Sequence, residues 1–282
     1  MALAIRVLKR RVRRFARDSL FRAGVLKQPR ESLDDCAIAI VSFAKSGRTW
    51  LRTMVGHVLV EALDLPKEKL LDTTALTRAA GLNLTRFTHD GTDNMPPGGF
   101  MTLKADKSAY RGKIVHLLYR DPRDIAVSAW FSATKRANLY DGPLSKFIRD
   151  PIMGVRKIAR FYKQWEDAAA VPKAFHFIRY KHLHADPMVP LRRILTDIGL
   201  PVSDAQLQRA IEASSFEHMR EMERSAQFQR QGEMLVPRDR ADEESYKVRR
   251  GVVGGYHDYM SEDDIAYVTQ VVAEEGNPFD SW

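Results

Sequence analysis

Short apolar runs that alternate with stretches of helical pattern constrain the fold of this chain more than any other feature. The runs are bounded by polar residues, as buried parallel strands are, and they cover residues 36–43, 114–119 and 174–180. Helical patterns follow these runs at residues 49–63, 122–137, 187–197 and 203–213. Strands that alternate with helices imply βαβ units and a parallel sheet. We therefore expect an α/β fold of three layers, in which helices flank a central parallel sheet.

The length and the charge distribution predict two parts of unequal size. The chain has 282 residues, enough for one large α/β domain, and we assign residues 31–282 to it. Residues 1–30 form a basic arm. Eight of the first 26 residues are Lys or Arg and one is an acid, so they carry +7 of the net charge of +9. The remaining body is close to neutral, which argues against a general nucleic-acid-binding surface.

The basic arm has the pattern of a short amphipathic helix, since Ile5, Leu8, Val12 and Phe15 fall at helical spacing with arginines between them. Such a helix either lies on an anionic membrane surface or packs its apolar stripe on the main domain. No apolar run approaches the roughly 18 residues of a spanning helix. The single cysteine, Cys36, fits a reducing compartment. We expect a cytoplasmic protein, with residues 1–26 as its contact with the inner face of a membrane if the arm binds lipid.

The polar loop after the first apolar run has the features of an anion-binding loop. Residues 42–50, Ser-Phe-Ala-Lys-Ser-Gly-Arg-Thr-Trp, lie where a buried strand turns into a helix, whose N-terminus offers N–H groups and the positive end of a dipole. Gly47 allows close backbone approach, Ser46 and Thr49 offer hydroxyl groups, and Lys45 offers a mobile cation. The Walker pattern G-x-x-x-x-G-K-[ST] is not matched, because Lys45 precedes Gly47. Taken alone, the segment is also compatible with a plain strand-to-helix turn.

A second phosphate-binding pattern follows the apolar run at residues 114–119. Asp121 is a suitable N-cap, Pro122 suits the first helical position, and Asp124 complements the helix dipole, so folding alone explains these three. Arg120 at the end of the strand and Ser128 on the following helix need another explanation. A cation and a hydroxyl group placed in this way can converge on a phosphate.

Both elements resemble those of sulfotransferases that use 3′-phosphoadenosine 5′-phosphosulfate (PAPS), in particular bacterial members of the cytosolic-sulfotransferase type. Residues 45–50 are similar to the 5′-phosphosulfate loop P-K-S-G-T-T-W, with Ala44 in place of the proline and Arg48 in place of the first threonine. Arg120 and Ser128 match the Arg and Ser that hold the 3′-phosphate in the family's R-x-x-R-D-x-x-x-S element. The resemblance implies a P-loop-type fold, PAPS as co-substrate and no metal.

Weaker matches extend the implied donor site. Residues 249–256 resemble the family's R-K-G-x-x-G-D-W element, which closes over the 3′-phosphate, although Gly255 and Tyr256 replace the Asp-Trp pair. Other aromatic and hydroxyl residues match family positions that contact adenine, where a core role is the ordinary alternative. Altogether the resemblance places the donor on Lys45, Ser46, Gly47, Arg48, Thr49, Trp50, Arg120, Ser128, Tyr180, Ser214, Phe216, Arg249, Arg250 and Gly251.

The expected chemistry is an in-line displacement, in which an acceptor hydroxyl or amine attacks sulfur and adenosine 3′,5′-bisphosphate leaves. Lys45 would stabilise charge on the leaving oxygen, and a histidine would take the proton. His89 lies between the two phosphate elements, where the family places its base, so we assign the base to His89 and keep His257 in reserve. Asp90 is the candidate to orient the imidazole ring. A surface role for His89 and a core role for His116 are the plain alternatives.

Two other functions stay open at the level of the sequence. A P-loop nucleotide kinase or NTPase shares the fold, but we find neither a Walker lysine nor Mg²⁺ ligands. A membrane or nucleic-acid binder that works through the arm would leave both phosphate elements unexplained. The acceptor, which is a glycan, a lipid or a small metabolite, is selected in this fold by variable loops. We expect these loops at residues 85–107, 138–152 and 221–247.

Overall fold

The computed structural model describes residue 33 and residues 35–276, apart from 66, 93, 96–98, 101–102, 138 and 226–238. The predicted arm at residues 1–30 therefore lies outside the described residues, as does part of the loop expected at 221–247. The described residues from Cys36 onward belong to one compact unit. Among the described residues, no helix is long and apolar enough to cross a membrane.

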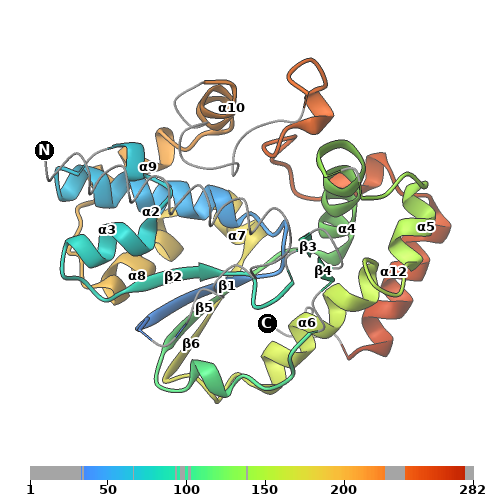
Figure 1. The fold of residues 1–282 in the computed structure, drawn as a ribbon, viewed down its shortest axis with the longest axis horizontal. Helices are drawn as coiled ribbons and strands as arrows, with labels where there is room; N and C mark the ends of the chain where they lie inside the picture. The colour runs from blue at the N-terminus through green and yellow to red at the C-terminus, as the bar shows by residue number, and fades with distance from the viewer. Residues whose placement is uncertain are drawn as a thin grey trace, which may run out of the picture. The chain divides into compact units, whose positions relative to one another are not determined.

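A four-stranded parallel sheet forms the centre of this unit (Figure 1). Its strands, in spatial order, are β2 (Thr85–Thr88), β1 (Ile38–Ser42), β5 (Ile114–Tyr119) and β6 (Ala174–Arg179). In register, Val41 of β1 lies opposite Thr88 of β2 and Leu117 of β5, and Leu117 lies opposite Phe177 of β6. The three predicted strands and the parallel sheet are thus confirmed.

The second strand in chain order was assigned to a loop by the sequence, and that prediction was wrong. β2 lies at an edge of the sheet, and its burial alternates between buried and half-buried residues. In β1, by contrast, all five residues are buried. A strand that is covered on both faces produces a continuous apolar run, whereas a short edge strand does not. The segment Thr-Arg-Phe-Thr therefore carries little periodic signal. A separate two-stranded antiparallel ribbon, β3 (Asn94–Met95) and β4 (Gly99–Phe100), lies further along the same predicted loop.

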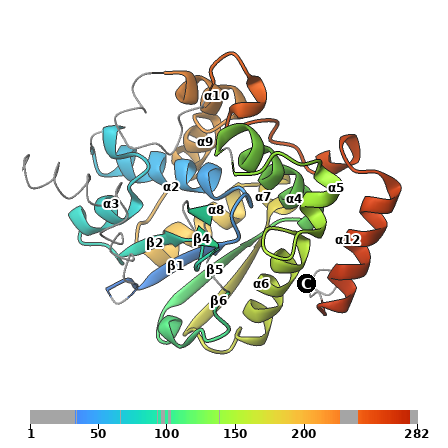
Figure 2. The same cartoon turned by 45° about the vertical axis from the view of Figure 1, so that its right-hand side comes forward.

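Helices cover both faces of the sheet, so the three-layer prediction is confirmed (Figures 1 and 2). Leu118 and Ile178 of the sheet pack in one apolar core with Leu51, Met54, Ile194 and Leu207. The helices of this first layer are α2 (Arg48–Ala62), α3 (Thr73–Ala79), α8 (Met188–Ile198) and α9 (Asp204–Glu212). The opposite layer holds α4 (Pro122–Phe131), α5 (Leu144–Arg149), α6 (Val155–Asp167) and α12 (Glu262–Glu274). Short 3-10 turns lie at Lys67–Lys69, Ser108–Tyr110, Glu243–Ser245 and Gly255–Asp258.

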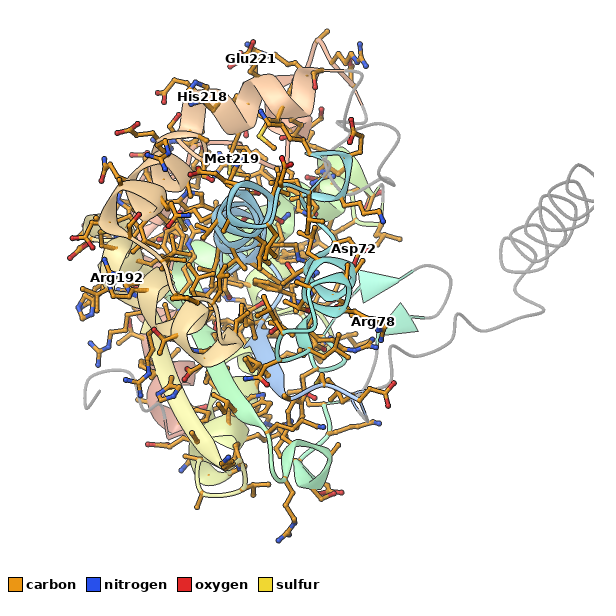
Figure 3. The ribbon with its side chains drawn as sticks, turned by 90° about the vertical axis from the view of Figure 1, so that its left-hand side faces the viewer. Asp72, Arg78, Arg192, His218, Met219 and Glu221 are labelled. Atoms are coloured by element: carbon orange, nitrogen blue, oxygen red, sulfur yellow. The ribbon has the colours of Figure 1, made fainter. Side chains whose placement is uncertain are left out.

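Two further helices lie near the carboxyl ends of the strands. α7 (Tyr180–Ala185) continues directly from β6, and α10 (Phe216–Arg224) precedes the C-terminal part of the chain. Figure 3 shows His218 and Glu221 on the outer side of α10 and Met219 on its inner side, where Met219 is 2% exposed. The helix predicted at residues 122–137 changes character, because α4 gives way to a π-helical turn, η3 (Ser132–Arg136).

The strand order reverses direction at one point of the sheet. From β1 the chain passes to β2 on one side, and it then returns across β1 to β5 on the other side. In open parallel sheets, ligands bind outside the carboxyl ends of the strands at such a switch point. Here the loop after β1 contains Lys45 and the residue after β5 is Arg120. The topology therefore brings the two predicted phosphate elements together.

Candidate active site

The loop between β1 and α2 presents uncapped backbone N–H groups. Gly47 is the N-cap of α2, adopts a left-handed conformation with φ of 94°, and supplies no side chain that could cap the helix. A side chain at this position would also be excluded, because a Cβ atom would lie 2.6 Å from Cε2 of Tyr180. Lys45 has a φ of 76°, which is unusual for a residue with a side chain. The backbone is therefore shaped so that the N-terminus of α2 is open to an anion.

The hydroxyl group of Ser46 does not face the loop's opening. Ser46 is fully buried, and its Oγ lies 2.9 Å from the hydroxyl oxygen of Tyr162 on α6. That Tyr162 hydroxyl also accepts a hydrogen bond from the backbone N of Arg120 at 3.4 Å. The Ser46 hydroxyl is thus linked through Tyr162 to Arg120 of the second phosphate element. The backbone N–H of Ser46 donates a hydrogen bond to the carbonyl of Phe43 at 3.3 Å.

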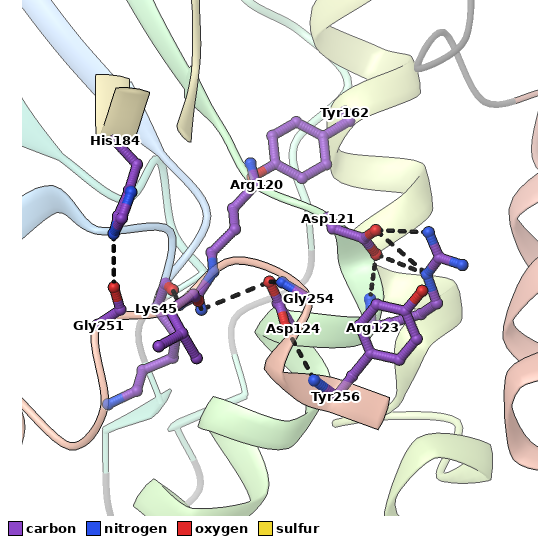
Figure 4. A network of polar contacts seen from close by, with 11 residues as sticks. Lys45, Arg120, Asp121, Arg123, Asp124, Tyr162, His184, Gly251, Gly254 and Tyr256 are labelled. Atoms are coloured by element: carbon purple, nitrogen blue, oxygen red, sulfur yellow. Dashed lines mark hydrogen bonds and ion pairs between the residues drawn. The ribbon is translucent and has the colours of Figure 1, made fainter. Parts of the chain in front are cut away.

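Arg120 joins three segments at the carboxyl ends of β1 and β5 (Figure 4). Its Nη1 donates to the carbonyl of Lys45 at 3.2 Å, and its Nη2 donates to the carbonyl of Val252 at 3.0 Å. The guanidinium group lies over the ring of Tyr180, 4.6 Å from its centre. Its Nε is buried and has no hydrogen-bond partner among the described residues. Arg120 therefore fixes the phosphate loop, and its Nε–H is a buried donor without a partner among the described residues.

Asp124 has a larger role than the helix-dipole contact expected from the sequence. Its carboxylate is buried and accepts hydrogen bonds from the backbone N of Gly254 at 2.9 Å and of Tyr256 at 3.1 Å (Figure 4). Its Oδ2 also lies 3.6 Å from Nη2 of Arg120. Asp124 thereby attaches the C-terminal segment that carries Arg249, Arg250 and Gly251 to the start of α4. Ser128 lies further along α4 and is half-buried.

The two arginines of the C-terminal segment have protein partners. Nη1 of Arg249 donates to the hydroxyl of Tyr259 at 2.7 Å and to Oε2 of Glu244 at 3.1 Å, and its guanidinium group lies over the ring of Phe131. Nη1 of Arg250 lies 2.6 Å from a carboxylate oxygen of Asp258. Binding of a phosphate by either side chain would exchange or share these contacts.

Aromatic residues of the predicted adenine site cluster beside the phosphate loop. The ring centres of Trp50 and Tyr180 lie 6.0 Å apart, and Nε1 of Trp50 donates to the carbonyl of Ser214 at 2.9 Å. The Ser214 hydroxyl is buried and has no hydrogen-bond partner within the described part of the chain. Phe216 is 38% exposed and lies against Gly251. Tyr180 is only 6% exposed, and its ring packs against Gly47 and against the guanidinium group of Arg120.

His184 joins this cluster, although no motif in the sequence indicated it. Its ring centre lies 6.0 Å from that of Trp50, and its Nε2 lies 2.9 Å from the carbonyl oxygen of Gly251 (Figure 4). If Nε2 carries the ring proton, this contact is a hydrogen bond that holds Gly251 beside α7. Only its position in the turn of helix after Tyr180 could have indicated this role.

Lys45 lies in a strongly positive environment. The residue keeps part of its surface exposed, but its ammonium group is surrounded by protein. Burial, followed by repulsion from Arg136, Arg120 and Arg249, lowers the pKa of Lys45 from 10.5 to about 7, whereas the carboxylate of Glu223 acts in the opposite direction. An anion that binds beside this lysine would raise its pKa, so the lysine would take up a proton near pH 7.

His89 follows β2 directly and is 9% exposed. Its Nδ1 lies 3.0 Å from the carbonyl oxygen of Ser42, which requires a proton on Nδ1, and 3.2 Å from the Ser42 hydroxyl. The neutral ring then has its basic lone pair on Nε2. Burial, with the nearby cations Arg48 and Lys247, holds the pKa of His89 well below its ordinary value of 6.5. The imidazole is therefore neutral at pH 7.

The predicted role of Asp90 was wrong. Its carboxylate accepts hydrogen bonds from Lys107 at 2.6 Å, Tyr110 at 2.9 Å and Trp165 at 3.1 Å. The partner that orients His89 is Ser42, at the end of the neighbouring strand. Adjacent residues at a strand end point in different directions, which explains why sequence adjacency was misleading.

Two residues near the site, the buried carboxylate Glu223 and Lys247, were not selected from the sequence. Glu223 on α10 is 1% exposed, and its carboxylate accepts from the backbone N of Lys247 at 2.6 Å and of Val248 at 2.9 Å. Burial lowers the pKa of Lys247 well below its ordinary value, and the charges of Lys45 and Arg136 lower it further. The contacts join segments 24 and 25 residues apart, so no local pattern could have indicated them.

The fold and the site define a class of protein before any comparison: an α/β protein of the P-loop type, with an uncapped helix N-terminus beside a cluster of cations. The sulfotransferase domain model matches residues 35–277. The chain therefore belongs to the sulfotransferase domain family.

Curated relatives and solved structures agree with this family at low sequence identity. Cytosolic sulfotransferase 10 of Arabidopsis thaliana is 23% identical over 280 residues, which cover 88% of this chain and 79% of that protein. Flavonol 3-sulfotransferase of Flaveria bidentis is 20% identical over 257 residues, covering 84% and 81%. The structure of mouse sulfotransferase SULT7A1 complexed with PAP is similar in fold, with a TM-score of 0.60, 19% identity and coverage of 89% and 91%.

Proposed function

We propose that this protein transfers a sulfuryl group from PAPS to a hydroxyl or amine group of an acceptor. The observation that carries the proposal is the junction at Arg120, where the loop after β1, the end of β5 and the segment near Val252 meet through one guanidinium group. The similarity to a sulfotransferase whose structure is described as complexed with PAP supports the choice of donor. The names of the cytosolic plant relatives support a cytoplasmic location.

The residues present fit an adenosine phosphosulfate. The uncapped N-terminus of α2 suits the 5′-phosphosulfate, and the unpartnered Nε of Arg120 suits the 3′-phosphate, together with Ser128 and the Arg249, Arg250 and Gly251 segment. The unpartnered hydroxyl of Ser214 lies beside Trp50 and suits the base. We assign Phe216 to the same base and give Tyr180 a supporting role beneath the loop.

The transfer step divides between His89 and Lys45. Nε2 of His89 accepts the proton of the attacking hydroxyl while the acceptor oxygen forms a bond to sulfur. The bond between sulfur and the bridging oxygen breaks, and the ammonium group of Lys45 stabilises the negative charge left on the bisphosphate. Because the donor's phosphates raise the pKa of the lysine, the bound complex holds the protonated form that this role requires.

The donor site can be tested by calorimetric titration with adenosine 3′,5′-bisphosphate, beside ADP with Mg²⁺. We expect saturable binding of the bisphosphate, weakened about 10- to 100-fold in Arg120→Ala, since a hydrogen-bonded charge contributes about 1.5–3 kcal/mol. Arg78→Ala is the matched control, because Arg78 lies exposed on α3 (Figure 3). Preference for ADP with Mg²⁺, or equal loss in both variants, would reject the donor site and favour the kinase alternative.

A further inference from the structure

Two histidines and an aspartate meet on the face of the sheet that α8 covers, away from the carboxyl ends of the strands. His116 in the middle of β5 lies opposite His176 of β6 in the strand register. Asp197 comes from the last turn of α8. One nitrogen from each histidine and one carboxylate oxygen all lie within 4.8 Å of one another. Three different elements therefore place nitrogen and oxygen donors around one point.

Two of the three distances within this cluster are close to those between ligands of a small divalent ion, and all three donor atoms lie within 4.8 Å of one another. Oδ2 of Asp197 lies 3.0 Å from Nε2 of His116 and 3.5 Å from Nε2 of His176. In a tetrahedral zinc site with bonds of about 2.0–2.2 Å, neighbouring ligand atoms are separated by about 3.3 Å. The two observed distances lie on either side of that value.

Three polar atoms of this cluster have no hydrogen-bond partner within the described part of the chain. His116 is fully buried, and neither of its ring nitrogens has a hydrogen-bond partner among the described residues, nor does Oδ2 of Asp197. Such buried polar atoms are rare and need an explanation. Nε2 of His116 lies 3.0 Å from Oδ2 of Asp197, but the two atoms lack the geometry of a hydrogen bond. A cation between them would account for this close approach.

The surroundings hold the donors in place and leave one side accessible. The backbone carbonyl of Asp197 accepts from Nδ2 of Asn83 at 2.8 Å, which anchors the end of α8. The side chains of His176 and Asp197 are 21% and 17% exposed, so an ion can enter from that side. Arg193 lies at the entrance, with Nε 3.7 Å from Asp197 and Nη2 at 3.4 Å from both ring nitrogens of His176, and is therefore aligned with neither lone pair.

We propose that His116, His176 and Asp197 form a binding site for a first-row divalent transition-metal ion, with Zn²⁺ as the preferred ion. Two imidazoles and one carboxylate are the donors that Zn²⁺ accepts, whereas Mg²⁺ prefers oxygen ligands alone. Three protein ligands leave a fourth position for water. The ion connects β5, β6 and α8 and takes no part in sulfuryl transfer, so this site is independent of the proposed function.

The test is a calorimetric titration of the metal-free full-length protein with Zn²⁺, with Co²⁺ to read the ligand geometry from its visible absorption and Mg²⁺ as the control ion. Because His116 is fully buried, the variants are His176→Gln and Asp197→Asn, which are partly exposed. We expect one Zn²⁺ site in the unmodified protein and at least a roughly 100-fold weaker affinity in either variant. His182→Gln, at an exposed position on α7, should retain the affinity.

Arg193→Gln provides a second arm, because removing the cation beside the site should tighten Zn²⁺ binding several-fold while leaving the fold intact. Zn²⁺ should also raise the melting temperature of the unmodified protein and fail to do so in His176→Gln. Absence of saturable Zn²⁺ binding, or binding that His176→Gln and Asp197→Asn do not weaken, would overturn the metal site and leave a proton shared between His116 and Asp197. Binding of adenosine 3′,5′-bisphosphate by the same variants shows separately whether the donor site is intact.

Discussion

At the scale of single residues, the charge state of Lys45 links donor binding to pH. Its pKa of about 7 in the free protein means that the ammonium group loses its proton as the pH rises through 7. The phosphates of the donor raise that pKa, so binding above pH 7 takes up a proton. We expect the affinity for adenosine 3′,5′-bisphosphate to fall as the pH rises from 7 to 9. Calorimetry in two buffers of different ionisation enthalpy measures the proton uptake directly.

A charge variant distinguishes this explanation from a general effect of pH. The Glu223 carboxylate raises the pKa of Lys45, so Glu223→Gln should move the decline in affinity to lower pH. Lys45→Ala should abolish the proton uptake, whereas Lys69→Ala, at an exposed position, should preserve it. Unchanged proton uptake in Lys45→Ala would assign the titration to another group.

His89 gives a second prediction at this scale. His89→Asn should reduce kcat by about 10²- to 10⁴-fold, because a general base is lost, and should leave the affinity for adenosine 3′,5′-bisphosphate unchanged. Sulfuryl transfer from PAPS to a phenolic acceptor measures the first quantity, and calorimetry measures the second. His182→Asn is the control. Since the pKa of His89 is held well below 6.5, activity should fall only when the pH drops through that low value. Full activity in His89→Asn would assign proton transfer to another group.

At the scale of elements, Asp124 decides how the C-terminal segment is attached to the donor site. In Asp124→Asn one oxygen acceptor becomes an NH₂ group that faces a backbone N–H, so one of the bonds to Gly254 and Tyr256 is lost. We expect the affinity for adenosine 3′,5′-bisphosphate to fall about 10-fold. Asp204→Asn on α9 is a matched control, because Asp204 is 82% exposed on the first layer of helices. If both variants bind equally well, the segment does not depend on Asp124.

The elements that the sequence predicted correctly are those whose environment is uniform along the chain. β1 and β5 are covered on both faces and therefore appear as apolar runs, and the loops that follow them contain the phosphate elements. β2 escaped prediction because an edge strand of four residues has no such run. Ser42 as the partner of His89, and Glu223 as the partner of Lys247, come from segments far apart in sequence. Contacts of this kind depend on the tertiary fold and have no local signal.

At the scale of the whole molecule, donor binding should stabilise the native state by mass action. At a concentration 100 times its Kd, adenosine 3′,5′-bisphosphate contributes about 2.7 kcal/mol. For a domain of this size that corresponds to a rise of about 5 °C or more in the melting temperature. Differential scanning fluorimetry of the full-length chain measures the shift. Adenosine without phosphates should produce none, and Arg120→Ala should lose most of it at the same concentration. An equal shift with adenosine would mean that the nucleoside, without the phosphates, accounts for the stabilisation.

The left-handed backbone at Lys45 lowers the stability of the native state, whereas the lysine side chain is required for activity. A side chain in this conformation costs about 1–2 kcal/mol relative to glycine, and the lysine adds a desolvated cation. Lys45→Gly should therefore raise the free energy of unfolding by about 1 kcal/mol or more in urea denaturation, while it abolishes sulfuryl transfer. A decrease would mean that the loop needs the lysine for folding. Selection of variants for thermal stability alone would therefore favour this substitution, and the stabilised variants that carry it would be inactive.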